Sequence, residues 1–381
     1  MSSGVDLTLR NEKFNLEAGL TSNEDLNKQH SDRYQFILPY FRYDTVQKND
    51  LGRINFYSSG NSTLQNTNNL RTRVINDINF SSVDFLSSKT GFKSNFNIYF
   101  KNVNTVAKED AIYKSSPQSE LMNIFEFNTS YPVIKETENT TQLLTPKASF
   151  RFNPGDMKSH SNADRAINVN NIFSVDRFNL EDSLESGRSL TLGLDYKNRS
   201  IEDNDEINVK LASVIRDEVE DTIPEKTTLN KKKSYIFGSV DYNKNNFLNF
   251  EYNFAADNNL GDINYHDLGV QFSLNNFVTD FNFIEENDVI GSAHIIENTS
   301  TINFDEKNFL SFKTRRNKEI NLTEYYDLIY EYKNDCLVAG LKFKKTFYQD
   351  RDLEPSEDLF FYLTLIPLTT IEQGIDENLY K

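Results

Sequence analysis

The sequence predicts an all-β fold, an antiparallel transmembrane β-barrel of the outer-membrane type. Apolar and polar residues alternate with a period of two along most of the chain, a pattern typical of strands with one apolar and one polar face. The chain contains no run of about 18 apolar residues, so no segment is predicted to form a membrane-spanning helix. The 381 residues include 30 Phe and 19 Tyr, which is more than a disordered acidic chain would carry.

The alternation is clearest in four segments, taken here in chain order. At 91–100 the apolar face holds Phe92, Phe96, Ile98 and Phe100. At 189–196 it holds Leu190, Leu192, Leu194 and Tyr196, and at 247–254 it holds Leu248, Phe250, Tyr252 and Phe254. At 326–332 it holds Tyr326, Leu328, Tyr330 and Tyr332. In a wide barrel that encloses water, these residues would face lipid and their neighbours the lumen.

The polar positions of these and neighbouring segments carry many charges. The residues that we predict to face the lumen are Glu251, Asp327, Glu331, Lys342 and Lys344.

Short polar turns separate the segments, at Asn245-Asn246, Asn275-Asn276 and Asn334-Asp335. These are typical of tight hairpins, so adjacent strands should be antiparallel. We expect about 16 to 18 strands, most about 9 to 12 residues long, which is the length that crosses a bilayer when tilted. Two long polar insertions, 153–187 and 215–232, are predicted to be loops, as expected where short turns alternate with long loops.

A soluble β-sandwich or β-solenoid is the main structural alternative, since half-buried strands in water also alternate. The composition favours the barrel. The polar face is charged and Asn-rich over nearly every segment, whereas a soluble sandwich packs its apolar faces into one core between Gly and Pro turns. A wide barrel needs the observed pattern because its inner face never packs into a dry core.

The charge and the reactive residues exclude several functions. A net charge of −16 argues against nucleic-acid binding, which needs clustered Lys and Arg. His30, His160, His266 and His294 show no metal-ligand spacing, and one cysteine cannot build a thiolate zinc site. Nothing marks a serine for Ser/His hydrolysis, and no glycine-rich phosphate loop is present. We therefore predict no enzyme, no catalytic residues, no metal and no cofactor.

The N-terminal stretch has neither a signal-peptide pattern nor an Arg-rich presequence. Either the protein is cytosolic, or this chain is the later part of a longer exported precursor. Cys336, just after the Asn334-Asp335 turn, is either a small buried hydrophobe or a partner for a cysteine outside this chain. In a barrel whose C-terminus is periplasmic, this turn would also be periplasmic, which favours the disulfide.

Two long stretches resemble the lipopolysaccharide-assembly LptD family, also called organic solvent tolerance proteins. One is TEYYDLIYEYKNDCLVAGLKFKKTFYQDRDLEPSEDLFFYLTLIPL near the C-terminus, and the other is 146–196. The second contains Asn-Ile-Phe-Ser and a closing Leu-Thr-x-Gly-Leu. The family loop motif residues there are Phe173, Arg177, Phe178, Asp182 and Gly187, together with Glu185. The segment 33–44 fits more loosely.

The resemblance implies a translocon of the cell outer membrane that inserts lipopolysaccharide into the outer leaflet through a lumen and a lateral gate. It also implies that 1–381 is the C-terminal part of one barrel, without the signal peptide, the N-terminal jelly roll and the first strands. The implied partners are lipopolysaccharide, outer-membrane lipid, an LptE-like plug lipoprotein, the barrel-assembly machinery, and a periplasmic bridge protein that binds the missing domain.

Two local features also follow from the resemblance. Cys336 would form a disulfide with the N-terminal region. The last strand, about 358–367, would be the gate strand, with Leu359, Phe361, Leu363 and Leu365 on one face and Pro367 ending its pairing. Two alternatives from other functional classes remain open at this stage. They are a general diffusion porin and a soluble β adhesin or carbohydrate-binding module.

Overall fold

The computed structural model describes residues 2–26, 28, 33–65, 68–110, 113–245, 247–347 and 355–366, and the backbone of 369–375. Within these residues there are 22 strands, all assigned to one sheet, and one short 3-10 helix, η1 (Glu225–Thr227). No helix of the described residues is long and apolar enough to cross a membrane. The prediction of an antiparallel all-β fold is therefore confirmed.

The strands are as follows: β1 Ser2–Arg10, β2 Phe14–Glu24, β3 Tyr34–Asn49, β4 Gly52–Gln65, β5 Leu70–Ser82, β6 Phe85–Leu86, β7 Lys93–Lys108, β8 Gln118–Ser130, β9 Val133–Glu136, β10 Thr140–Asn153, β11 Gly187–Ser200, β12 Glu206–Arg216, β13 Ile236–Lys244, β14 Leu248–Ala256, β15 Ile263–Leu274, β16 Phe277–Glu286, β17 His294–Asn303, β18 Asn308–Asn317, β19 Leu322–Lys333, β20 Leu337–Thr346, β21 Glu357–Leu365 and β22 Thr369–Ile375.

The chain forms two compact units. Unit 1 comprises Met1–Pro132, Pro146–Leu192 and Val214–Lys233. Unit 2 comprises Val133–Thr145, Gly193–Ser213 and Ser234–Lys381.

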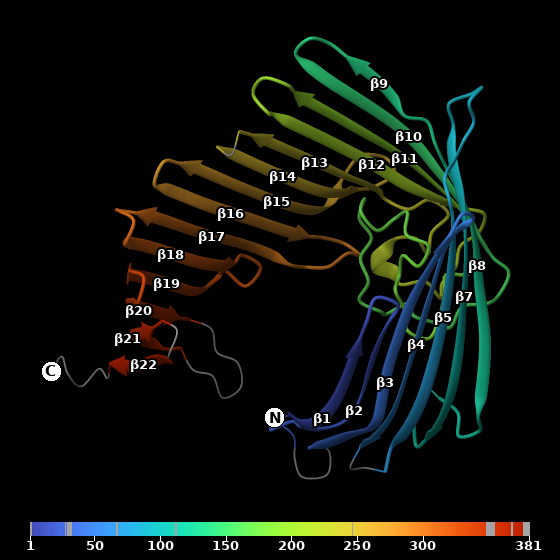
Figure 1. Cartoon of the computed structure of the whole chain (residues 1–381), viewed down its shortest axis with the longest axis horizontal. Helices are drawn as coiled ribbons and strands as arrows, with labels where there is room; N and C mark the ends of the chain where they lie inside the picture. The colour runs from blue at the N-terminus through green and yellow to red at the C-terminus, as the bar shows by residue number, and fades with distance from the viewer. Residues whose placement is uncertain are drawn as a thin grey trace. The chain divides into compact units, whose positions relative to one another are not determined.

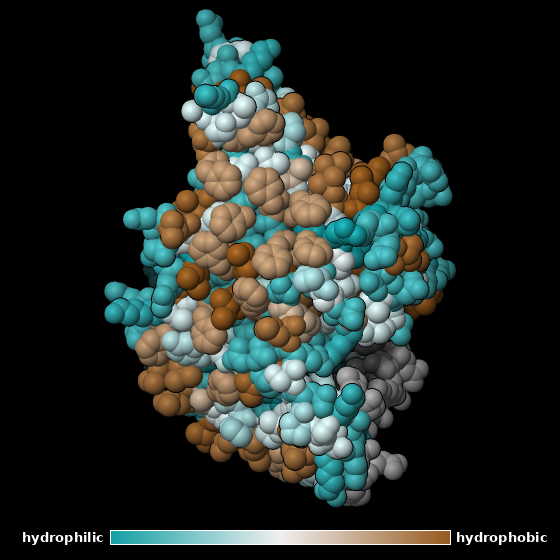
Figure 2. Space-filling view, turned by 90° about the vertical axis from the view of Figure 1, so that its right-hand side faces the viewer, coloured by the Kyte–Doolittle hydropathy of each residue, from teal (hydrophilic) through white to brown (hydrophobic). Residues whose placement is uncertain are grey.

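Unit 1 is a wall of long antiparallel strands, β1 to β5, then β7, β8 and the end of β10, each paired with the next (Figure 1). The cross-strand register places one set of large apolar side chains on a single face, which we call the outer face. Its exposed members include Ile78, Phe96, Phe100, Phe125, Phe127, Phe150 and Phe152. Figure 2 shows apolar side chains gathered over this side of the molecule. This face confirms the alternation predicted at 91–100.

The opposite face of this wall, which we call the inner face, is packed. Ile75, Tyr99, Val103, Met122 and Ile124 are all buried there, in one cluster with Leu184 and, at its edge, Val175. Both of the latter belong to the 154–186 segment that joins β10 to β11. The expectation that the inner face never packs into a dry core is therefore wrong for unit 1, because a folded loop covers it.

Most of unit 2 is a meander from β12 to β22, in which each strand pairs antiparallel with the next. Its turns are short, and Asn245 and Asn275 take positive φ angles of 49° and 51°. Asparagine tolerates this left-handed conformation better than most residues. The predicted hairpins are therefore present at these positions.

Three strands account for most of the difference between the 22 strands and the predicted 16 to 18. The structure includes short strands, β6 and β9, that leave almost no periodic signal, and it continues past 367 with β22. The prediction that 358–367 is the last strand is wrong, because β22 pairs with β21 from Leu359↔Ile375 to Leu365↔Thr369. Strand β21 ends at Leu365, and the antiparallel strand β22 begins at Thr369.

Candidate functional site: folded loops on the inner face of unit 1

Two loops that were predicted as long polar insertions fold onto the inner face of unit 1. The first inner loop, 154–186, joins β10 to β11, and the second inner loop, 217–233, follows β12. They bury Ile167, Ile172, Phe178, Leu184, Ile223 and Leu229, each at most 6% exposed. A loop that only extends into water would not bury such side chains, so these loops have a core of their own.

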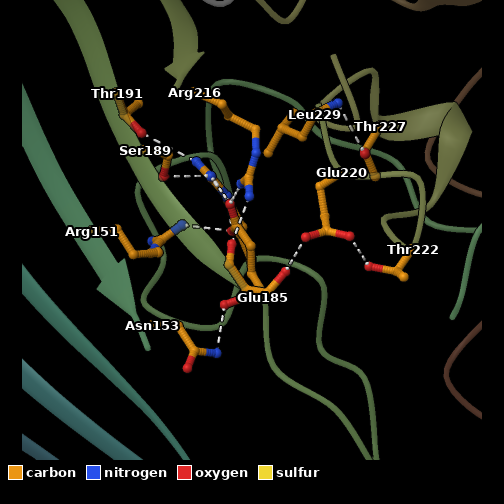
Figure 3. Close-up of polar contacts among 12 residues, drawn as sticks. Arg151, Asn153, Glu185, Ser189, Thr191, Arg216, Glu220, Thr222, Thr227 and Leu229 are labelled. Atoms are coloured by element: carbon orange, nitrogen blue, oxygen red, sulfur yellow. Dashed lines mark hydrogen bonds and ion pairs between the residues drawn. The ribbon is translucent and has the colours of Figure 1, made fainter. Parts of the chain in front are cut away.

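One carboxylate, Glu185, is the centre of the polar contacts that hold the loops. It accepts hydrogen bonds from Arg177 of its own loop, from Arg151 of β10 and from Arg216 at the end of β12. The Arg177 Nε to Oε2 distance is 2.6 Å, and the Arg151 Nη1 to Oε2 distance is 3.1 Å. Figure 3 shows the Glu185 side chain directed toward the guanidinium groups of Arg151 and Arg216. Three elements far apart in sequence therefore meet at one buried charge.

We call Glu185, Arg151, Arg177 and Arg216 the Glu185 centre, and further groups compensate its buried charges. Arg151 Nη2 also pairs with Glu126 Oε2 of β8 at 2.5 Å. Arg177 donates to Ser189 and Thr191 hydroxyls, each at 3.1 Å, and Arg216 donates to the Ser186 carbonyl at 2.6 Å. Three arginines thus share two carboxylates and several neutral acceptors, and buried charges need this kind of compensation.

Burial alone would raise the pKa of Glu185, but the positive charges of Arg177, Arg151 and Arg216 outweigh it and lower that pKa to about 2. The pKa of Glu185 in the folded protein lies below its ordinary value. The carboxylate therefore contributes its full stabilisation of the loops at pH values above the ordinary glutamate pKa. This contribution is lost as the pH falls from about 4.5 toward 2. At neutral pH the carboxylate is ionised.

Gly187 lies where the first inner loop enters β11. Its φ is +77°, and an added Cβ would lie 3.0 Å from Arg216 Nη2. A side chain here would both strain the backbone and crowd an arginine of the centre.

The two inner loops are also tied to each other. Ser186 Oγ donates to Glu220 Oε2 at 3.0 Å, and Thr222 Oγ1 donates to Glu220 Oε1 at 2.7 Å (Figure 3). The backbone N–H of His160 donates to the Thr222 carbonyl at 2.8 Å. Neither loop is held by the wall alone.

A second polar group surrounds Asp182 of the first inner loop. Tyr113 Oη donates to Asp182 Oδ2 at 2.8 Å, and His160 Nε2 lies 3.0 Å from Oδ1. Burial would raise the pKa of Asp182, but hydrogen bonds from His160 and Tyr113 and the charges of His160 and Lys158 lower it well below its usual range. In the described part of the chain, no serine hydroxyl bonds to His160. The group anchors a loop and lacks the nucleophile of a triad.

All five residues of the family loop motif lie in or beside this arrangement. Arg177, Phe178 and Asp182 are buried, Gly187 closes the loop, and Phe173 packs under Lys147, whose Nζ lies 4.4 Å from the ring centroid. Sequence reasoning missed Arg151, Arg216 and Glu126. The only signal for them was a single charge at a polar-face position of a strand next to an insertion.

The residues predicted to face the lumen share one face of unit 2. Lys342 Nζ lies 4.0 Å from Asp327 Oδ2, and Tyr362 Oη donates to Glu331 Oε2 at 2.5 Å. Lys344 is the cross-strand partner of Asp327. Glu251 of β14 is exposed and lies opposite Asp241 and Gly269. The alternation therefore places these residues on one side of the strands, and that this side faces a lumen stays a prediction.

The C-terminal predictions have mixed outcomes. Leu359, Phe361, Leu363 and Leu365 alternate with polar and aromatic residues along β21, opposite Phe343, Leu341, Ala339 and Leu337 of β20. Pro367 lies outside the described residues. Cys336 is exposed and unpaired within this chain, and its N–H donates to Asn334 Oδ1 at 3.0 Å. The buried-hydrophobe alternative for Cys336 is therefore excluded.

Two of the remaining histidines, His266 of β15 and His294 of β17, lie on either side of Glu285 of β16 as its cross-strand partners. His266 Nδ1 lies 2.8 Å from Tyr252 Oη, and His294 packs edge-on against Phe283. His30 is outside the described residues. Among the residues that the structure describes, no group of three or more His, Cys, Asp or Glu side chains is placed to hold a metal ion.

Comparisons with solved structures and curated proteins add little. The ferric enterobactin receptor PfeA of Pseudomonas aeruginosa is 10% identical over 98% of this chain and 71% of its own, with a TM-score of 0.41. The siderophore receptor PirA of Acinetobacter baumannii is 9% identical over 96% and 71%, also with a TM-score of 0.41. The copper transporter OprC is 9% identical over 100% and 72%, with a TM-score of 0.39. No curated protein matches the chain.

The family comparison is more informative. Residues 99–303, more than half of the chain, match the model of the LptD family, described as LPS transport system D. The matched region includes the first and second inner loops and every residue of the Glu185 centre. The chain therefore belongs to the LptD family of outer-membrane β-barrel proteins.

Proposed function

We propose that this protein inserts lipopolysaccharide into the outer leaflet of the outer membrane, as a translocon subunit that carries out no chemical reaction. The observation that carries the proposal is the family match over 99–303, which spans both inner loops. The two-faced strands support it, because unit 2 has a largely apolar face, which Asn298 and Ser300 interrupt at β17, and a charged polar face.

The physical argument starts from the cargo. Lipopolysaccharide has acyl chains and a sugar head, so passage through a closed barrel would place acyl chains in water or sugars in hydrocarbon, and both are costly. A seam that opens sideways avoids this cost. Acyl chains then enter the bilayer while the sugar head follows a polar face such as that of Glu251, Asp327, Glu331, Lys342 and Lys344. An LptE-like plug, the barrel-assembly machinery and a periplasmic bridge protein belong to this proposal.

Depletion of the protein in its own cells tests the proposal. We expect newly made lipopolysaccharide to stop reaching the cell surface and to accumulate at the inner membrane, while uptake of small hydrophilic solutes stays unchanged. Surface labelling of lipopolysaccharide and a solute uptake assay measure the two effects. Normal surface lipopolysaccharide with reduced solute uptake would instead identify a diffusion porin and refute the proposal.

Cys336 provides a separate test of how this chain joins the rest of the protein. Because its thiol is exposed next to a tight turn, we expect it to form a disulfide with a cysteine in the N-terminal region of the full-length protein. Non-reducing electrophoresis should then show a mobility shift that reductant abolishes and that Cys336→Ser lacks. An identical band pattern for wild type and variant would rule out the bridge.

A further inference from the structure

Unit 1 contains a cavity of about 700 Å³ between its inner face and the first inner loop. Strands β2, β3, β4, β5 and β7 supply one side, and Arg165 and residues 179–181 of the loop supply the other. Pockets of this size bind small molecules or the head groups of larger ones. Neither the Glu185 centre nor the Asp182 group lines it.

Two of the four basic side chains that line the cavity form no ion pair with a described residue, although Arg165 Nη1 donates to the Asp164 carbonyl at 3.2 Å. Lys101 Nζ lies 3.8 Å from Asp77 Oδ1, and Arg73 Nη1 lies 2.6 Å from Glu181 Oε2, so these four charges compensate one another. The other basic side chains that line the cavity are Arg42 and Arg165. Both are exposed, and neither forms an ion pair with any described residue.

The remaining acid of the lining, Glu17, is the cross-strand partner of Arg42 in β2 and β3. It leaves the cavity with four basic and three acidic side chains, in a chain whose net charge is −16. Asp176 also lies close to Lys101, with its Oδ2 3.7 Å from Nζ, so four basic side chains meet four acids and the cavity is close to neutral. Guanidinium groups bind phosphate in a bidentate geometry, which makes Arg42 and Arg165 suited to a phosphate group.

Other groups of the lining suit a sugar. Tyr57 is 37% exposed and lies four residues before Asn61 on the same face of β4. An aromatic ring such as that of Tyr57 can pack against the C–H face of a pyranose. The ring of Tyr40 lies over Gly19, where an added Cβ would be 2.8 Å from Tyr40 Oη. The Asn61 Oδ1 atom is buried without a hydrogen-bond partner. A buried acceptor left without a donor costs about 1 to 3 kcal/mol, which a ligand hydroxyl would relieve.

We propose that this cavity binds a phosphorylated sugar, with the phosphate on Arg42 and Arg165, a hydroxyl on Asn61 Oδ1 and the sugar ring against Tyr57. The inference rests on the proposed function only for the source of this group, the head of lipopolysaccharide. A free sugar phosphate has the same chemistry, and the test below separates the two sources.

The test is calorimetric titration of the purified full-length protein in detergent with glucosamine 1-phosphate, and with glucosamine and inorganic phosphate separately. We expect the sugar phosphate to bind at least tenfold more tightly than either part. Arg42→Gln combined with Arg165→Gln should weaken binding at least tenfold. Tyr57→Ala should weaken binding of the sugar phosphate and leave inorganic phosphate binding unchanged. Arg188→Gln, at a 62% exposed side chain outside the cavity, should bind as wild type does.

Several results would overturn the proposal. They are the absence of binding to the wild type, equal binding of inorganic phosphate and sugar phosphate, or unchanged binding in the double arginine variant. Displacement of the probe by purified lipopolysaccharide, but not by the same lipid after dephosphorylation, would identify the lipid head as the source. Displacement by neither would identify a free sugar phosphate. The depletion experiment stands apart from this one, since binding is measured without transport.

Discussion

Glu185→Gln should release both inner loops from the wall of unit 1. The substitution keeps the shape and one carbonyl acceptor but removes the charge that compensates three buried arginines, among them Arg177, whose side chain is fully buried. Breaking a buried ion pair by removing one partner costs about 3 to 5 kcal/mol, because the other charge is left uncompensated. We expect faster amide hydrogen exchange and faster proteolysis across 154–186 and 217–233, measured on the purified full-length protein.

The matched control is Asp217→Asn in the second inner loop. Asp217 Oδ2 pairs with Arg188 Nε at 2.8 Å, but the two side chains are 34% and 62% exposed. An exposed pair contributes at most about 1 kcal/mol, so exchange in both loops should stay near that of the wild type. Glu185→Asp keeps the charge and should restore part of the protection. If Glu185→Gln exchanged no faster than Asp217→Asn, the Glu185 centre would not hold the loops.

Whether a feature of this arrangement can be predicted from the sequence depends on how far apart along the chain the interacting residues are. Two-residue alternation is local, and it correctly assigned the apolar faces at 91–100 and along β14. In β11, Leu190, Leu192 and Leu194 are exposed while Ser189 and Thr191 are buried, as the alternation requires. Turn residues such as Asn275 act locally too, and they marked the hairpins. The apolar face of each strand and the hairpin connections between strands could therefore be predicted from the sequence.

The fold of the inner loops was not predictable in this way. Ile167, Ile172, Phe178 and Leu184 follow neither a period of two nor one of 3.6, so the segment looked like a polar insertion. The burial of Leu184 depends on Tyr99, Val103 and Ile124 of distant strands, with which it forms one cluster. Arg151 and Arg216 likewise have no local signal, because their partner Glu185 lies 34 and 31 residues away. The resemblance pointed to Arg177 and Asp182, but only the packing explains them.

Phe281→Arg should block assembly into a bilayer far more than the neighbouring Asn282→Arg. Phe281 lies at the centre of β16, between Val270 of β15 and Asn298 of β17. Asn282 lies on the opposite face, between Gly269 and Glu297. An arginine that faces lipid near mid-bilayer costs about 2 to 4 kcal/mol, which lowers the folded-to-unfolded ratio roughly 30- to 700-fold.

Asn282→Arg is the matched control, because it places the same side chain one residue further along β16, on the opposite face of the strand. An arginine at 282 would lie in water beside the acidic Glu297, so we expect a change of at most about 1 kcal/mol there. Urea titration of the full-length protein in lipid vesicles measures both free energies of unfolding. Since every membrane argument for unit 2 depends on which face meets hydrocarbon, equal losses for the two variants would contradict the facing assignment. A larger loss at 282 would reverse it and place Glu251, Asp327 and Glu331 in lipid, where charged side chains are costly.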